Sequence, residues 1–317
     1  MKRVMKVLGV ILLVMIAGIS VLVIKGFIES KKAALESDYY EAFTYSAPLE
    51  QKYSQLGTYA VANTEFPSEN KAIQKYLFWY PAELEKTENQ YPVIVVVNAS
   101  GTPAHKYEAW FERLASWGFV VVGNEDPQTG TGETASLTLD YILHLPDNHI
   151  LYNKLDTENI GIVGFSQGGA GALAAVTEYA NGTVYKAIFT GSAAYPFLAE
   201  NMGWHYDVSK IKIPYFMVAG TGKSDDRGVA DPTQEFAGVS PLSAMLESYH
   251  LLSEDSFNVL ARAAGAEHED MLIRSDGYMT AWMLYQLTDD VEASQVFVGS
   301  NAEILHNSNW QEVEKNQ

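Results

Sequence analysis

Ser166 lies in a pattern that can turn a serine hydroxyl into a nucleophile. Residues 160–169 read IGIVGFSQGG, so a short apolar run stops at a serine that is flanked by Gly164 and Gly168. Glycines on both sides leave room for a sharp strand-to-helix turn, which exposes the serine hydroxyl and the backbone N–H that follows it. The pattern predicts a nucleophile elbow at Ser166. The alternative interpretation is a glycine-rich turn in an inert domain.

A serine nucleophile needs a base to accept its proton, and histidine is the usual one. The chain has seven histidines, so the candidate base must be selected by its position relative to the predicted strands. His268 follows the apolar segment 258–262 through a loop of small residues, late in the chain, where an elbow-type hydrolase places its base. We predict His268 as the base, with His105 as its competitor near the expected oxyanion loop. The others are expected to be surface or packing residues: His144, His149, His205, His250 and His306.

An acid must orient the imidazole of the base. The apolar segment 213–220 reads IPYFMVAG and is soon followed by two aspartates, Asp225 and Asp226. We prefer Asp225 as the acid, with Asp226 as the alternative and Asp231 as a third choice. An aspartate that is not the acid is expected to be a solvated loop charge or a cap. The order nucleophile, acid, base along the chain is the one expected of elbow-type hydrolases.

The oxyanion of the reaction needs two converging N–H donors. The backbone of Gln167, directly after the nucleophile, is one expected donor. The other should come from the loop that follows the strongly apolar segment 92–98, PVIVVVN. We predict the Ser100 N–H, with Gly101 as the alternative. An ordinary turn is the plain interpretation of this loop.

These candidates need elements that place them together, and the hydrophobic pattern predicts alternating strands and helices. Strands are expected at 59–66, 73–80, 92–98, 119–122, 160–163, 185–190, 215–219 and 258–262, and helices at 107–117, 137–145 and 169–179. Such an alternation predicts an α/β fold with a mostly parallel, doubly wound sheet and helices on both faces. Catalytic loops then lie at the carboxyl ends of the strands.

The first residues of the chain predict a membrane segment. Residues 7–24 are 18 uncharged, mostly apolar positions, preceded by Lys2, Arg3 and Lys6. As a helix they would reach about 27 Å, enough to cross a hydrocarbon core. We favour an uncleaved signal anchor over a cleaved signal peptide, because the apolar run ends at Lys25 without a small-residue cleavage site. The basic flank favours a cytoplasmic N-terminus and an extracellular domain.

The predicted domain organisation has three parts. Residues 1–27 form the anchor and transmembrane helix, 28–56 a stalk or linker, and 57–317 one catalytic domain. Without residues 1–32 the chain has 15 basic and 38 acidic residues (21 − 6 and 39 − 1), a formal charge of −23. A strongly acidic domain argues against a nucleic-acid partner. The chain has no cysteine, which excludes disulfides, thiol catalysis and cysteine-ligated metals.

Several segments together resemble a known family. They are VVVNASGT, LASWGFVVVGNEDPQTGTG, NIGIVGFSQGGAGA and PYFMVAGTG, followed by an aspartate and by His268 before Met271 and Leu272. They are similar to the α/β-hydrolases of the dienelactone hydrolase and cutinase-like (polyester hydrolase) group, over residues 73 to about 290. Two features depart from that group: Ala99 stands where glycine is usual, and the segment 222–241 is longer than the usual turn.

The resemblance implies serine esterase chemistry through an acyl-enzyme intermediate, without a cofactor or a metal. It gives Ser166, Asp225 and His268 the roles assigned above. The expected partners are an ester substrate, which could be a small molecule, a polyester or a lipid, and a membrane through the N-terminal helix. The alternative functions are an acyltransferase that uses the same three residues, and an inactive anchored binding protein that keeps the hydrolase fold.

Overall fold

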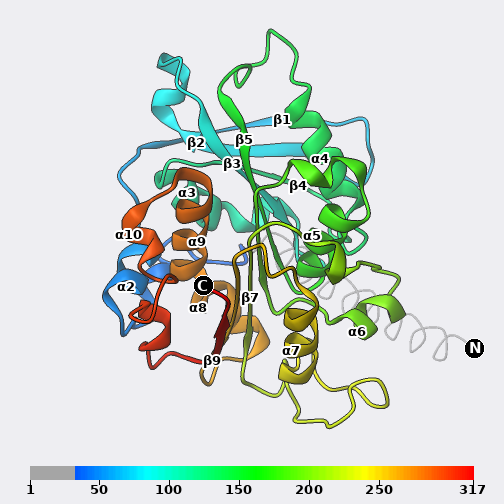
Figure 1. The fold of residues 1–317 in the computed structure, drawn as a ribbon. Helices are drawn as coiled ribbons and strands as arrows, with labels where there is room; N and C mark the ends of the chain where they lie inside the picture. The colour runs from blue at the N-terminus through cyan, green and yellow to red at the C-terminus, as the bar shows by residue number, and fades with distance from the viewer. Residues whose placement is uncertain (1–32) are drawn as a thin grey trace, which may run out of the picture.

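A nine-stranded mixed sheet forms the centre of the molecule, of which the computed structural model describes residues 33–317 (Figure 1). The strand order is β1-β2-β4-β3-β5-β6-β7-β8-β9. The six strands from β4 to β8 in this order run parallel, whereas β1, β2 and β9 pair antiparallel. The strands are β1 Val61–Pro67, β2 Lys75–Pro81, β3 Tyr91–Val97, β4 Val120–Asn124, β5 Leu155–Phe165, β6 Ala187–Gly191, β7 Tyr215–Gly220, β8 Asn258–Ala263 and β9 Trp310–Lys315.

Helices cover both faces of this sheet. Figure 1 shows α2, α3, α9 and α10 on one side of the sheet and α4, α5, α6 and α7 on the other. The helices are α2 Pro48–Ser54, α3 Glu108–Ser116, α4 Glu133–Leu143, α5 Gln167–Thr177, α6 Pro196–Asn201, α7 Leu242–Leu251, α8 Met271–Arg274, α9 Asp276–Thr288 and α10 Val291–Ser294. Short 3-10 helices are η1 Tyr39–Glu41, η2 Ala82–Lys86, η3 Ala104–Tyr107, η4 Ala180–Val184, η5 Val208–Lys210, η6 His268–Asp270 and η7 Glu303–Leu305.

This arrangement confirms the expected α/β class with a mostly parallel, doubly wound sheet. All eight expected strands are present, with ends that differ by a few residues from the sequence prediction. The ninth strand, β9, was not predicted. It lies at the edge of the sheet and reads WQEVEK, in which only Trp310 is buried, so its composition resembles that of a polar tail.

The predicted transmembrane helix, at 1–27, lies outside the described residues. Within residues 33–317, no helix is both long enough and apolar enough to span a bilayer.

The central strands are buried on both faces, which explains their continuous apolar composition. In β3, Ile94 and Val96 face the side of the sheet covered by α3 and α9, while Val93 and Val95 face the side covered by α4 and α5. The two layers of core therefore hold the strands in register, and with them the loops at the carboxyl ends.

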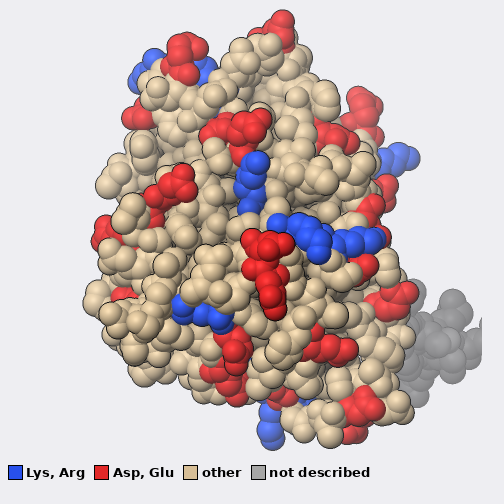
Figure 2. Space-filling view, in the orientation of Figure 1, with Lys and Arg blue, Asp and Glu red and all other residues tan. Residues whose placement is uncertain are grey.

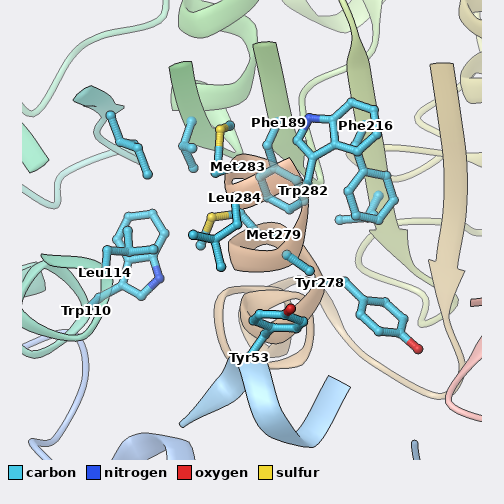
Figure 3. Packing of buried hydrophobic residues seen from close by; sticks show 14 of the residues in the cluster. Tyr53, Trp110, Leu114, Phe189, Phe216, Tyr278, Met279, Trp282, Met283 and Leu284 are labelled. Carbon is cyan, nitrogen blue, oxygen red and sulfur yellow. The ribbon is translucent and has the colours of Figure 1, made fainter. Parts of the chain in front are cut away.

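Helix α9 is the most deeply buried of the helices on the face of the sheet covered by α2, α3, α9 and α10. Figure 3 shows Trp282, with Met279 and Met283 nearby, next to the sheet residues Phe189 and Phe216. The rings of Trp282 and Phe216 have centroids 5.6 Å apart, and the indole N–H donates to the Ile188 carbonyl at 3.0 Å. This packing fixes the position of α9 and of the short helices η6 and α8 that precede it.

The described part of the expected stalk, residues 33–56, packs on the domain. Helix α2 lies against α9, and Leu35, Tyr39 and Tyr53 are buried in the same core layer. The sequence pattern concealed this because the buried aromatic residues are separated by charged ones.

A buried polar network holds this segment in place. The Arg113 guanidinium pairs with Asp276, and the Tyr39 hydroxyl donates to Asp276 Oδ2 at 2.7 Å. Arg113 Nε in turn donates to the Tyr39 hydroxyl oxygen at 2.8 Å. All three side chains are buried. The segment that contains Tyr39 is therefore held to α3 and α9 by hydrogen bonds to charged groups as well as by packing.

Carboxylates are spread widely over the face of the molecule seen in Figure 2, with lysine and arginine side chains in a few small groups. The acidic excess on this face is thus distributed and is not confined to one cluster.

Candidate active site

Ser166 lies in a strained turn between β5 and α5. Its φ of 55° and ψ of −123° are unusual for a residue with a side chain. The turn requires both flanking glycines: a Cβ on Gly164 would lie 2.1 Å from the Gly168 carbonyl oxygen, and one on Gly168 would lie 2.2 Å from the Val97 carbonyl oxygen. The local sequence therefore folds into an elbow that presents the serine hydroxyl at the end of β5.

A chain of hydrogen bonds joins Ser166 to His268 and Asp225. His268 Nε2 lies 2.9 Å from Ser166 Oγ, and His268 Nδ1 lies 2.7 Å from Asp225 Oδ1. Because a carboxylate only accepts, Nδ1 carries the proton and Nε2 is left to accept from the serine hydroxyl. Asp225 lies in the loop after β7, and His268 begins η6 shortly after β8.

The second oxygen of Asp225 is also fully bonded. Asp225 Oδ2 accepts from Ser192 Oγ at 2.5 Å and from the Gly220 backbone N–H at 2.8 Å, and the side chain is completely buried. Ser192 was not identified from the sequence. Its signal is positional: it directly follows β6, which lies between β5 and β7, the strands that lead to Ser166 and Asp225.

The alternative aspartates have other partners. Asp226 Oδ2 pairs with Arg262 Nη1 at 2.9 Å and accepts from the Leu242 N–H at 3.2 Å. Asp231 is exposed and accepts from the backbone and hydroxyl of Thr233. Neither one bonds to His268, so the geometry distinguishes Asp225 where the sequence left a choice.

His105 is paired elsewhere as well. Its Nδ1 lies 2.5 Å from Glu125 Oε2, and its backbone N–H donates to the same carboxylate at 3.2 Å. It follows the loop after β3, as the sequence placed it, but Ser166 is not among its bonded partners.

The charge of Asp225 sets the basicity of His268. Burial alone would lower the pKa of His268, but the hydrogen bond and the negative charge of Asp225 outweigh it, so the pKa is raised above its ordinary value. The raised pKa makes the imidazole a stronger proton acceptor from the serine.

The loop after β3 has one N–H without an acceptor among residues 99–102. Ala99 N–H donates to the Tyr107 hydroxyl oxygen at 3.3 Å, Gly101 N–H to the Pro127 carbonyl at 3.0 Å, and Thr102 N–H to the Ala99 carbonyl at 3.1 Å. Within the described chain, the Ser100 N–H remains unpaired. Gln167 opens α5, and the first N–H groups of a helix have no partner within it.

Ser100, Ser166 and His268 line a pocket of about 410 Å³, a usual size for a small-molecule site. Ser166, His268 and Ser192 contribute its polar surface, while Phe165 and Leu272 contribute apolar surface. Among residues 33–317, no group of three or more His, Cys, Asp or Glu side chains could hold a metal ion.

The family model for PET hydrolase-like proteins matches residues 53–312, a range that includes the elbow and both of its partners. The chain belongs to the PET hydrolase-like family. This confirms the resemblance to the cutinase-like polyester hydrolase group, and it supports a hydrolase that acts on esters. No curated protein matches the chain. Residues 33–52 precede the part shared with PET hydrolase-like proteins, although they pack against it.

Proposed function

We propose that the protein is a serine carboxylic-ester hydrolase that works through an acyl-enzyme intermediate. The observation that carries this proposal is the continuous hydrogen-bonded chain from Ser166 Oγ through His268 to Asp225, which opens on a pocket of about 410 Å³. Membership of the PET hydrolase-like family supports an ester as the substrate.

In the first half of the reaction, Ser166 Oγ attacks the ester carbonyl carbon while His268 Nε2 takes the hydroxyl proton. Asp225 keeps the imidazole oriented and stabilises its positive charge. The tetrahedral intermediate then collapses, the bond to the alcohol oxygen breaks, and Nε2 returns the proton to the leaving alcohol. The acyl group stays bonded to Ser166.

In the second half, a water molecule attacks the acyl-enzyme while His268 removes its proton, and the carboxylic acid leaves as Ser166 regains its hydrogen. We assign the oxyanion to the N–H groups of Ser100 and Gln167. Two facts support this: the Ser100 N–H has no acceptor within the described residues, and Gln167 is the first residue of α5. The bond from Gly101 N–H to Pro127 disfavours Gly101 as the second donor.

We also keep the proposal that residues 1–27 hold the enzyme in the cell membrane, with the catalytic domain outside. The apolar composition of 7–24 and the basic residues before it support this placement. Fractionation of cells that express the full chain, followed by protease treatment of intact cells, tests both the membrane association and the exposure of the domain.

The test of the chemistry combines turnover with labelling. The full chain should hydrolyse a short p-nitrophenyl ester, and Ser166→Ala should reduce the rate to background. The exposed Ser300→Ala variant is the control and should keep the wild-type rate. A fluorophosphonate should label the wild-type protein at Ser166. Absence of both turnover and labelling would favour the inactive binding protein, and a label mapped to another residue would refute the site.

A further inference from the structure

The pocket that contains Ser166 is not formed by the family-matched residues alone. Ala34 and Leu35 also line it, and among the described residues before residue 53 they are the only ones that do. They belong to the segment that precedes the range shared with PET hydrolase-like proteins. Residues outside the common part of the fold thus contact the same cavity as the reacting serine.

This segment is held firmly at two points. The Ala34 N–H donates to the Lys106 carbonyl at 2.8 Å, next to the loop that carries Ser100. A few residues later, Tyr39 is buried and bonded to Asp276 and Arg113. Because both contacts are to well-packed parts of the domain, Ala34 and Leu35 are set against the pocket as a fixed wall.

The side chain that this wall presents is apolar. Leu35 is only 8% exposed and shares a core layer with Tyr107, Phe165 and Met271. Of these, Tyr107 and Phe165 also line the pocket, together with Leu272. One side of the cavity is therefore a continuous hydrophobic surface to which the N-terminal segment contributes.

We propose that Ala34 and Leu35 are specificity-determining residues that limit the size of the apolar group that an ester can place beside Ser166. This inference rests on the proposed esterase function. Each additional methylene that finds apolar surface in a pocket raises affinity by about fourfold. A change in the volume at this wall should therefore act on long esters and leave short ones nearly unaffected.

The test uses two substitutions with opposite effects in the full chain. Leu35→Ala widens the pocket and Ala34→Trp narrows it. The matched controls are Leu84→Ala, a buried leucine in the other core layer, and Ala60→Trp, an exposed alanine directly before β1. The quantity measured is the ratio of kcat/KM for a long ester to that for a short one. The first series compares p-nitrophenyl octanoate with p-nitrophenyl acetate and varies the acyl group. The second compares octyl acetate with ethyl acetate and varies the alcohol.

We expect Leu35→Ala to raise the ratio by about fourfold or more in at least one series, and Ala34→Trp to lower it by about tenfold. Both controls should stay within about twofold of the wild-type ratio. Ratios that do not change in either variant, with acetate hydrolysis intact, would overturn the inference and leave the proposed function standing. An exposed position such as Ala34 keeps the test available if Leu35→Ala fails to fold.

Labelling distinguishes a failure of the specificity inference from a failure of the proposed esterase function. Ser166 of the wild type should react with both a methyl and a dodecyl fluorophosphonate, and Ala34→Trp should slow only the dodecyl reagent. Equal slowing of both reagents would contradict a role in specificity. A wild type that reacts with neither reagent and hydrolyses neither ester would instead refute the esterase function itself, and this inference with it.

Discussion

Ser192 Oγ lies 2.5 Å from Asp225 Oδ2 and donates to it from a residue whose own backbone has a φ of 46°. A non-glycine residue with positive φ is held there by its surroundings, and the Ser192 N–H is bonded to the Val218 carbonyl at 2.7 Å. The loop after β6 thus holds the Asp225 carboxylate, which is in turn bonded to His268 Nδ1. In the proposed mechanism, Ser192 is a positioning residue for Asp225.

Ser192→Ala should reduce kcat by roughly tenfold while KM changes little, because Asp225 loses one donor and its orientation relaxes. Ser192→Thr, which keeps a hydroxyl, should recover part of the loss. Steady-state kinetics of the two variants check this, with Ser248→Ala in α7 as a control for the loss of a buried hydroxyl. Equal kcat for Ser192→Ala and wild type would show that the Gly220 N–H alone is sufficient to hold Asp225 in position.

The two neighbouring aspartates should behave differently when each is changed to asparagine. Asp225→Asn should lower kcat by roughly 10³-fold or more, since an amide favours the wrong tautomer of His268. Asp226→Asn should keep most of its kcat and lose about 1 kcal/mol of stability, because it weakens the pair with Arg262. Activity and thermal unfolding of both variants distinguish them. Small and similar losses in kcat would point to Asp231.

The pH dependence of kcat/KM should have an acidic limb above pH 6.5, the ordinary pKa of histidine. Only the neutral imidazole accepts the serine proton, and Asp225 stabilises the charged form, so a higher pH is needed to produce the neutral one. Asp225→Asn should move the midpoint of the residual activity to lower pH. A wild-type limb below pH 6.5 would contradict the raised pKa.

The elbow glycines should tolerate no side chain. Gly164→Ala and Gly168→Ala each place a Cβ within 2.2 Å of a backbone oxygen, which cannot move aside. In both variants the free energy of unfolding should fall by about 3 kcal/mol or more, and activity should be lost. Gly299→Ala is a suitable control, since its φ of 79° brings strain but nothing lies within 4 Å of the added carbon. Urea unfolding should show that Gly299→Ala lowers the free energy of unfolding by only about 1 kcal/mol.

Removing one partner of the buried Arg113–Asp276 pair should be strongly destabilising. Arg113→Met leaves the Asp276 carboxylate buried without its counter-charge, at a cost of about 3–5 kcal/mol. The double variant with Asp276→Leu should regain part of this stability, because neither charge remains. Chemical unfolding of the single and double variants measures the difference. A single variant as stable as wild type would mean that the network contributes nothing.

The parallel strands and the elbow could be predicted because their signals are local. A run such as 92–98 is apolar since the strand is buried on both faces, and the glycines around Ser166 are required by contacts a few residues away or on the next strand. The strand order then brought the candidate loops to one edge of the sheet. Asp225 could not be separated from Asp226 because the choice depends on a distant cation, Arg262, that pairs with only one of them.

Ser192 and the wall formed by Ala34 and Leu35 could not be predicted for a related reason. Each acts through contacts with residues far away in the sequence, and a single serine or leucine carries no spacing that identifies it. Tyr39 was also missed, because its partners Arg113 and Asp276 lie in helices that the sequence alone does not bring together. Long-range pairing, more than local composition, separates the predicted part of the site from the rest.

The bonds of Tyr39 also affect how the protein can be produced. A shortened chain that starts at residue 53, where the family match begins, would lose Tyr39 and leave Arg113 Nε and Asp276 Oδ2 each without one of their partners in the core. It would also expose the part of α9 that α2 covers. A recombinant chain should therefore begin at about residue 33, so that it keeps both the core around Tyr39 and the edge of the pocket beside Ser166.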